Sequence, residues 1–214
     1  EAIIKGSYDI GIAFDGDGDR ILIVNSDGNI LDGDDILYIL SKEIPTNSGV
    51  VGTLMTNKAL ELYFQNEGIE FSRADVGDKY VLQRLIERSW SLGGEPSGHI
   101  ICLDSAPTGD AIVAALKFLN AIKDKGFSIE KSLEGFKKFP QTLINLKVNN
   151  PNKIIISDKF WEKVTEIELH LGEDGRVLIR PSGTEPLIRI MVESKDSGLS
   201  ENLCNSLADL AQRI

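Results

Sequence analysis

Near the start of the chain, two short runs of apolar residues lie on either side of an acidic loop. Residues 9–14 and 21–24 are mainly apolar and predict two buried strands. The Asp-Gly pair at 27–28 favours a hairpin connection, because it tolerates the positive backbone angles of tight turns. Two aspartates at 34–35 then predict the start of a helix, since carboxylates are favourable at a helix N-terminus.

From about residue 50 the pattern changes to strands that alternate with helices. We expect strands at 50–54, 70–74, near 92 and at 99–103, and helices at 57–67, 80–89 and 110–123. Such alternation predicts right-handed crossovers and a mainly parallel sheet, with ligand-binding loops at the carboxyl ends of its strands. Ser128 is expected to cap a further helix that runs to about Phe139.

Beyond Pro140 the pattern predicts a separate small α+β domain. Its expected elements are strands at 142–148, 166–171, 177–180 and 187–192, a helix near 158–164, and a final helix capped by Ser200. The pair Asp174-Gly175 predicts a hairpin between two of these strands, and therefore an antiparallel sheet. The predicted fold class is α/β followed by α+β.

Composition limits the classes of function that the chain can have. A formal net charge of −10 argues against a general nucleic-acid binder, which needs a surplus of Lys and Arg on one face. No apolar run approaches the roughly 20 residues of a membrane-spanning helix, and no secretory signal is evident, so we expect a cytoplasmic protein with no membrane partner. Cys102 and Cys204 lie far apart in apolar surroundings, which favours reduced, structural thiols.

The loop DGDGDR carries the clearest candidate chemistry. Asp15, Asp17 and Asp19 alternate with residues that include two glycines, so the backbone can curl around a small cation, and hard carboxylate oxygens suit Mg²⁺. An EF-hand does not fit the spacing, because Arg20 occupies the position of its glycine and Ser26 that of its glutamate. A solvated acidic turn is the remaining alternative, although three adjacent carboxylates repel one another without a cation.

A second polar loop, GGEPSGH, follows the predicted strand near residue 92. Glu95 can accept hydrogen bonds from two neighbouring sugar hydroxyls, and Ser97 and His99 add polar groups at alternate positions. An ordinary turn with a capping serine and a hydrogen-bonded histidine explains the same residues. His170 alternates within a predicted strand and is interpreted as structural.

A third loop, RPSGTEP, connects two predicted strands near the end of the chain. Arg180, Ser182, Gly183 and Thr184 provide a guanidinium group, two hydroxyls and a run of backbone N–H groups opened by glycine. These are the components of a phosphate-binding loop. A tight hairpin loop rich in Pro, Ser and Gly is the alternative.

In this order and at these intervals, DGDGDR, GEPSGH and RPSGTEP resemble the metal-binding, sugar-binding and phosphate-binding loops of the α-D-phosphohexomutases. The resemblance covers nearly the whole chain. It implies that Asp15, Asp17 and Asp19 bind Mg²⁺ and that Arg20 faces the phosphoryl group in transit. It further implies that the sugar is bound by Glu95, Ser97 and His99, and that the non-reacting phosphate is bound by Arg180, Ser182, Gly183 and Thr184.

The stretches GVVGTLMTNKALEL, VGDKYVL and RPSGTEPLIRIMVE are most similar to the branch of that family that acts on an amino sugar. This implies interconversion of glucosamine 6-phosphate and glucosamine 1-phosphate, on the route to UDP-N-acetylglucosamine and the cell wall. Asp78 stands where relatives acting on mannose or glucose often carry a histidine, and neither it nor Lys79 receives a role. The open alternatives are a glucose or mannose phosphomutase, a Mg²⁺-dependent phosphatase with Asp15 as nucleophile, and a non-catalytic sugar-phosphate binding module.

One family motif is absent from the sequence. In the family, a phosphorylated serine in a Ser-His-Asn-Pro context donates and accepts the phosphoryl group, and this chain, which begins at Glu1 and looks truncated, has no such motif. The resemblance therefore implies the tail of domain two at 1–44, domain three at 45–140 and domain four at 141–214. The implied partner is the missing N-terminal half of the same enzyme, and a homodimer stays open.

Overall fold

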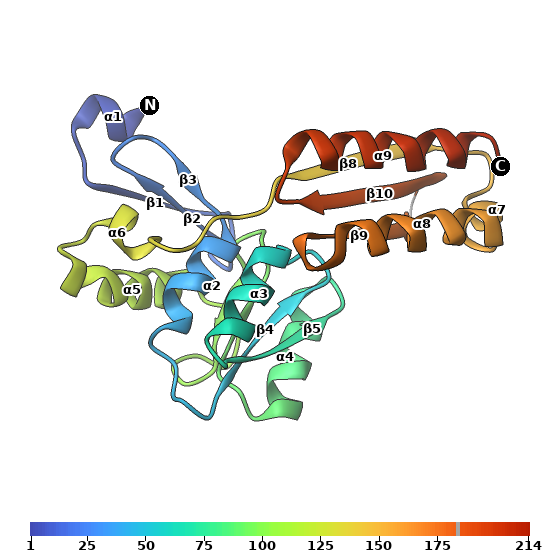
Figure 1. The fold of residues 1–214 in the computed structure, drawn as a ribbon. Helices are drawn as coiled ribbons and strands as arrows, with labels where there is room; N and C mark the ends of the chain where they lie inside the picture. The colour runs from blue at the N-terminus through green and yellow to red at the C-terminus, as the bar shows by residue number, and fades with distance from the viewer. Residues whose placement is uncertain (183–184) are drawn as a thin grey trace. The chain divides into compact units, whose positions relative to one another are not determined.

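The computed structural model describes residues 1–182 and 185–214 (Figure 1). The chain divides into two compact units, residues 1–137 and 138–214, which are described separately below. Among the described residues, no helix is both long enough and apolar enough to cross a membrane.

The first unit opens with a short helix and a three-stranded antiparallel sheet in the order β1-β2-β3. These elements are α1 (Ala2–Gly6), β1 (Ile10–Phe14), β2 (Ile21–Asn25) and β3 (Ile30–Leu31). Strand β2 alternates buried and exposed positions, and its buried Ile21 and Ile23 anchor the sheet in the core. The predicted hairpin is confirmed, because β2 pairs with β3 and Gly28 in the connection has a φ of 86°. The acidic loop lies between β1 and β2.

The second sheet of this unit has the strand order β5-β4-β6-β7. Strands β4, β5 and β6 are parallel, whereas β7 pairs antiparallel with β6. The strands are β4 (Gly49–Thr53), β5 (Glu70–Ala74), β6 (Leu92–Gly94) and β7 (Ile100–Cys102), and the helices are α2 (Gly33–Ser41), α3 (Lys58–Asn66), α4 (Asp78–Arg88) and α5 (Ala111–Ile122). The predicted alternation of strands and helices in a mainly parallel sheet is confirmed.

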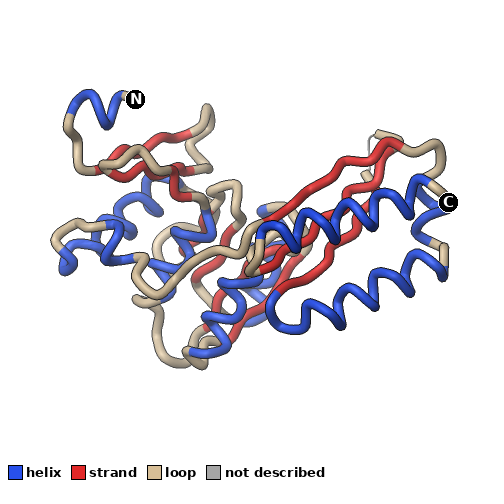
Figure 2. The backbone as a smooth tube through the Cα atoms, turned by 45° about the horizontal axis from the view of Figure 1, so that its top comes forward, coloured by secondary structure: helices blue, strands red, loops and turns tan. Residues whose placement is uncertain are grey.

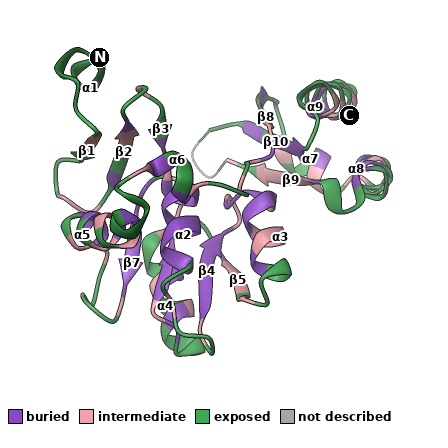
Figure 3. Ribbon diagram, turned by 60° about the vertical axis from the view of Figure 1, so that its left-hand side comes forward, coloured by how far each residue is buried: buried purple, intermediate pink, exposed green. Residues whose placement is uncertain are grey.

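Helices cover both faces of this sheet. Val50 of β4 packs in the larger core with α2, α3 and α5, whereas its neighbour Val51 points to the other face and packs with Val81 and Leu85 of α4. Figure 3 shows the result as continuous burial along β4 and α2. A strand buried on both faces is rigid, so loops at its end are held in defined positions.

The end of the first unit differs from the prediction. Ser128 caps a helix as expected, but α6 spans only Ile129–Ser132, after a 3-10 turn at Lys123–Lys125. Gly135 has a φ of 87°, which is incompatible with a continuing helix. The expected helix to Phe139 was therefore wrong in its length.

The second unit is an antiparallel sheet in the order β8-β10-β9, with helices on one face (Figures 1 and 2). Its elements are β8 (Gln141–Lys147), α7 (Pro151–Ile155), α8 (Asp158–Leu171), a 3-10 turn (Gly172–Asp174), β9 (Gly175–Pro181), β10 (Leu187–Ser194) and α9 (Ser197–Gln212). Buried residues of α8 and α9 pack on Ile188, Ile190 and Val192 of β10. The predicted α+β class is confirmed.

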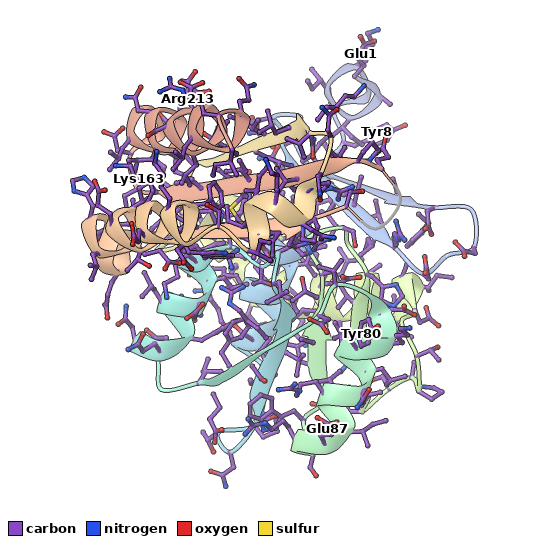
Figure 4. The ribbon with its side chains drawn as sticks, turned by 90° about the vertical axis from the view of Figure 1, so that its right-hand side faces the viewer. Glu1, Tyr8, Tyr80, Glu87, Lys163 and Arg213 are labelled. Carbon is purple, nitrogen blue, oxygen red and sulfur yellow. The ribbon has the colours of Figure 1, made fainter. Side chains whose placement is uncertain are left out.

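Three details of the second unit were predicted wrongly. Residues 166–171, including His170, continue helix α8 instead of forming a strand, and Asp174-Gly175 leads from this helix into β9 instead of forming a hairpin. Helix α9 begins at Ser197 with Asp196 as its cap, so Ser200 lies inside the helix. Lys163 of α8 and Arg213 after α9 are labelled in Figure 4.

Candidate functional site

The acidic loop is organised by the carboxylate of Asp15. Its Oδ1 accepts hydrogen bonds from the backbone N–H groups of Gly18, Asp19 and Arg20 at 3.1, 3.2 and 3.2 Å. Gly18 has a φ of 74°, a conformation that favours glycine and lets the loop curl back on the Asp15 side chain. The Gly18 carbonyl in turn accepts a hydrogen bond from Ala111 at the start of α5, at 3.0 Å.

The three predicted metal ligands converge. Oxygen atoms of Asp15, Asp17 and Asp19 all lie within 4.8 Å of one another. Asp19 Oδ1 is buried and accepts no hydrogen bond from the described residues, and Arg20 Nε is 3.9 Å away. Burying a carboxylate oxygen without a partner is costly, and three carboxylates this close repel one another. The donor set is all oxygen, so the loop fits a hard divalent cation such as Mg²⁺.

Two of these carboxylates have pKa values that shift in opposite directions. For Asp15, loss of hydration raises the pKa, but the backbone hydrogen bonds from Arg20 and its neighbours outweigh that effect and the net pKa is lowered. For Asp19, loss of hydration, the adjacent Asp15 carboxyl group and the charge of Asp17 raise the pKa, against an opposing effect of His99. The backbone hydrogen bonds therefore favour the ionised form of Asp15.

Arg20 lies beside the carboxylates with most of its side chain exposed. Its Nε is 3.8 Å from Asp15 Oδ2, and 56% of the side chain is accessible to solvent. Contacts this long to exposed groups are weak. The guanidinium group is therefore available to an anion that approaches the loop.

His99, predicted to contact the sugar, lies against the acidic loop. The imidazole is buried, with Nδ1 3.2 Å from Asp19 Oδ2. On its other side, a Cβ added to Gly109 would lie 2.1 Å from Nε2, so only glycine leaves room for the ring there. The backbones of Arg20 and His99 also form an isolated β-bridge. The DGDGDR and GGEPSGH loops are thus neighbours, and a sugar contact of His99 stays a prediction.

Glu95 and Ser97 follow β6 at the carboxyl end of the parallel sheet. Along the chain, β5 is placed on one side of β4 and β6 on the other, so the strand order reverses between β4 and β6. Ligands of open α/β sheets bind outside the carboxyl ends of the strands at such a point. The side chain of Glu95 is partly buried, and its Oε1 accepts a hydrogen bond from the N–H of Gly77 at 2.9 Å. Ser97 is exposed.

In the second unit, the register of the sheet reveals an arginine that the sequence analysis missed. Arg180 of β9 lies directly opposite Arg189 of β10, which lies opposite Asn145 of β8. These three residues share the face that α8 and α9 do not cover, because their neighbours Ile188 and Ile190 point into the core. Within the described residues neither arginine forms an ion pair. Like charges directly opposite each other are destabilising, so the pair is suited to an anion.

Only part of the predicted phosphate loop is described. Ser182 donates its N–H to the carbonyl of Leu187 at 2.9 Å, and its Oγ accepts from the N–H of Glu185 at 3.3 Å. Gly183 and Thr184 lie outside the described residues.

Comparison with known protein families shows which family the chain belongs to. Residues 32–139 match the phosphoglucomutase/phosphomannomutase alpha/beta/alpha domain III, and residues 143–210 match the C-terminal domain of the same family. The chain belongs to the phosphoglucomutase/phosphomannomutase family. The acidic loop at 15–20 lies before the first of these two matches.

Curated relatives extend this match along the chain. The phosphoglucosamine mutase of Janthinobacterium sp. (strain Marseille) is 47% identical over 216 residues, which cover 97% of this chain and 47% of that protein. The phosphoglucosamine mutase of Legionella pneumophila (strain Corby) is 44% identical over 222 residues, covering 100% of this chain and 49% of that protein. The chain thus spans about half the length of the relatives it matches.

Solved structures share the fold. A phosphoglucomutase/phosphomannomutase family protein from Burkholderia thailandensis has a TM-score of 0.80 at 24% identity, over 98% of this chain and 48% of that one. Aspergillus fumigatus N-acetylphosphoglucosamine mutase in complex with GlcNAc-6P and magnesium has a TM-score of 0.76 at 20% identity, over 94% and 48%. At these identities the likeness concerns the fold alone.

Proposed function

We propose that this chain provides the metal-, sugar- and phosphate-binding loops of an enzyme that interconverts glucosamine 6-phosphate and glucosamine 1-phosphate. The observation that carries the proposal is the contact between the two loops of the first unit, where the carboxylate cluster meets the GEPSGH loop through Asp19 and His99. A site that places a cation beside a sugar-binding loop suits the transfer of a phosphoryl group on a sugar. The relatives named phosphoglucosamine mutase support the choice of an amino sugar.

Asp15, Asp17 and Asp19 would hold Mg²⁺. When bound, the cation would supply positive charge to the oxygens of the phosphoryl group in transit. Three backbone hydrogen bonds to Asp15 favour its ionised form, which is the form that binds a cation. Arg20, exposed beside the cluster, would neutralise charge on the same phosphoryl oxygens.

Glu95 and Ser97 would orient the sugar through its hydroxyl groups. Because one oxygen of the Glu95 carboxylate already accepts the Gly77 N–H, its Oε2 is the oxygen best placed to accept from a hydroxyl. His99 would also connect the sugar-binding loop to the metal-binding loop, since its Nδ1 contacts Asp19.

Arg180, Ser182, Gly183 and Thr184 would bind the phosphate group that does not react. We add Arg189 to this set, because it lies directly opposite Arg180 and shares its sheet face. Two guanidinium groups can form charge-assisted hydrogen bonds to several oxygens of one phosphate.

We further propose the family domain layout given by the sequence: the tail of domain two at 1–44, domain three at 45–140 and domain four at 141–214. In this proposal the phosphorylated serine and the remaining substrate contacts come from an N-terminal half that is not part of this sequence. The chain alone would then bind Mg²⁺ weakly, would bind sugar phosphate weakly if at all, and would transfer no phosphoryl group.

Two experiments test the proposed function. The enzyme that contains this chain together with its N-terminal half should be assayed side by side on glucosamine, glucose and mannose 6-phosphates, and glucosamine 6-phosphate should give the highest kcat/KM. A preference for glucose or mannose would move the assignment to the corresponding phosphomutase. For the chain alone, incubation with glucose 1,6-bisphosphate and Mg²⁺ should leave the intact mass unchanged. A stable gain of one phosphate, mapped to Asp15 or Ser97, would contradict the proposal, as would hydrolysis of the bisphosphate.

A further inference from the structure

Gly33, the first residue of α2, is in unusually close contact with the predicted sugar-binding loop. Its N–H donates a hydrogen bond to the carbonyl of Pro96 at 3.1 Å. A Cβ added to Gly33 would lie 1.8 Å from the carbonyl oxygen of Glu95, 2.9 Å from its carbonyl carbon and 3.1 Å from the nitrogen of Gly98. All three obstructing atoms are backbone atoms, which cannot rotate away. Any other residue at this position would therefore displace the loop.

The conformation of Gly33 itself does not require glycine. It is absent from the set of glycines with positive φ, and it is the first helical residue, between Asp32 and Asp35 of a complete capping box. In the interior of other helices, replacing glycine with alanine stabilises the helix. The reason for a glycine here is the proximity of the Glu95 carbonyl.

Glu95 is held at its other end as well. Its carboxylate accepts the N–H of Gly77, the residue before α4, at 2.9 Å, and Gly77 has a φ of 130° that favours glycine. The backbone of Glu95 thus rests on the start of α2, and its side chain is tied to the start of α4. A shift of the backbone would carry the carboxylate away from Gly77.

We infer that Gly33 is a positioning residue that sets where Glu95 presents its carboxylate to the sugar. The inference rests on the proposed function, in which Glu95 binds sugar hydroxyls. Gly33 would act without touching the substrate, because the contact passes through the backbone of Glu95 and Pro96. A displacement of about 1 Å at a binding group is enough to cost much of its contribution.

A ligand-free measurement tests the geometric step. In the Gly33→Ala variant, the amide of Gly77 should exchange with solvent at least about tenfold faster than in the unmodified chain, since a hydrogen bond to a charged acceptor is lost. Gly198→Ala in α9 is the matched control, because a Cβ there would lie 3.3 Å from Asp196 Oδ1, the end of a flexible side chain. The control should leave the Gly77 rate unchanged. An unchanged Gly77 rate in Gly33→Ala would overturn the inference.

A binding measurement tests the functional step. Glucosamine 6-phosphate is titrated with Mg²⁺ present and followed by NMR, and Gly33→Ala should weaken its affinity about fivefold or more. In a Glu95→Gln background the same substitution should change the affinity less than twofold, because its effect passes through Glu95. Equal effects in both backgrounds would overturn the inference. If the unmodified chain binds no glucosamine 6-phosphate, the affinity comparison is made on the enzyme that contains this chain together with its N-terminal half. Absence of binding there would overturn the proposed function, while the exchange measurement still decides the positioning step.

If Gly33→Ala does not fold, the unmodified chain gives the answer by hydrogen exchange. The amides of Gly33 and Gly77 should both be protected, and a Glu95→Gln substitution should reduce protection at both positions. Exchange of Gly33 at the rate of an open amide, or insensitivity of both amides to Glu95→Gln, would contradict the inference.

Discussion

The acidic loop of the first unit and the paired arginines of the second unit concentrate charge in different ways. The carboxylate of Asp15 accepts three backbone N–H groups, and that of Asp19 contacts His99. The loop therefore has a defined shape without a bound cation. Arg180 and Arg189 are instead brought together by strand register alone. Under the proposed function, the cation site would be preorganised, whereas the side chains of the phosphate site would be ordered by their ligand.

The largest effect is expected at the acidic loop. Asp17→Asn removes one anionic ligand from a site with few alternatives, so the affinity of the chain for Mg²⁺ should fall by about tenfold or more. Isothermal titration calorimetry measures this directly. Asp27→Asn, at an exposed aspartate in the β2–β3 turn, is the matched control and should leave Mg²⁺ binding unchanged. Equal affinity in Asp17→Asn and the unmodified chain would show that the cluster is only a solvated turn.

A smaller effect of opposite sign is expected at the arginines. Without phosphate, Arg189→Gln removes a like-charge repulsion and should raise the free energy of unfolding by about 0.2–1 kcal/mol at low salt. With inorganic phosphate present, the same variant should gain less in Tm than the unmodified chain, because one of the two guanidinium groups that would bind phosphate is gone. Arg213→Gln, after the end of α9, should change neither quantity. A loss of stability in phosphate-free buffer would contradict the account of an unbalanced pair.

The third effect concerns Arg73, an arginine whose charge is balanced. Its Nη2 lies 2.6 Å from Glu61 Oε2, and its Nη1 donates to the carbonyls of Thr53 and Thr56. Burial raises the pKa of Glu61, but the hydrogen bonds and charges of Arg73 and Lys58 outweigh it and lower the pKa below 4.5. Glu61→Gln should therefore cost about 1 kcal/mol at pH 7.

The pH dependence of that cost follows from the direction of the shift. Because the folded-state pKa of Glu61 is depressed, its contribution is fully present above the unfolded value near 4.5 and is lost as the pH falls through the folded-state pKa. Urea unfolding of the Glu61→Gln variant and the unmodified chain at pH 7 and at pH 3 measures the difference. A cost that grows toward acid pH would show that the ion pair does not stabilise the fold.

Local patterns were sufficient to predict much of the fold and the position of the loops. The DGDGDR loop is bounded by two apolar strands, and both strands formed, but the expectation that both are buried was wrong for β1, which has no buried residue. The error at residues 166–171 arose because Glu-Ile-Glu-Leu-His-Leu alternates with the period of a strand over six residues. Over the longer segment, Phe160, Val164, Ile167 and Leu171 repeat with the spacing of a helix, and that stripe packs in the core.

Contacts between distant segments could not be predicted from the sequence. The approach of His99 to Asp19, and that of Gly33 to Glu95, depends on how the loops of one unit fold together. The pairing of Arg189 with Arg180 depends on the register of β9 and β10. A shift of this register by two residues would keep the same side chains on the buried face, so the apolar pattern alone does not determine which residues pair.

Under the proposed function, DGDGDR is a preformed Mg²⁺ site next to the sugar loop. A titration of the chain with Mg²⁺, followed by NMR at each backbone amide, tests it most directly. The account predicts the largest shifts at Gly18, Asp19 and Arg20, whose amides bond to Asp15, and a further shift at His99. Larger shifts at another acidic segment, such as residues 32–35, with none at the Asp15 loop, would contradict it.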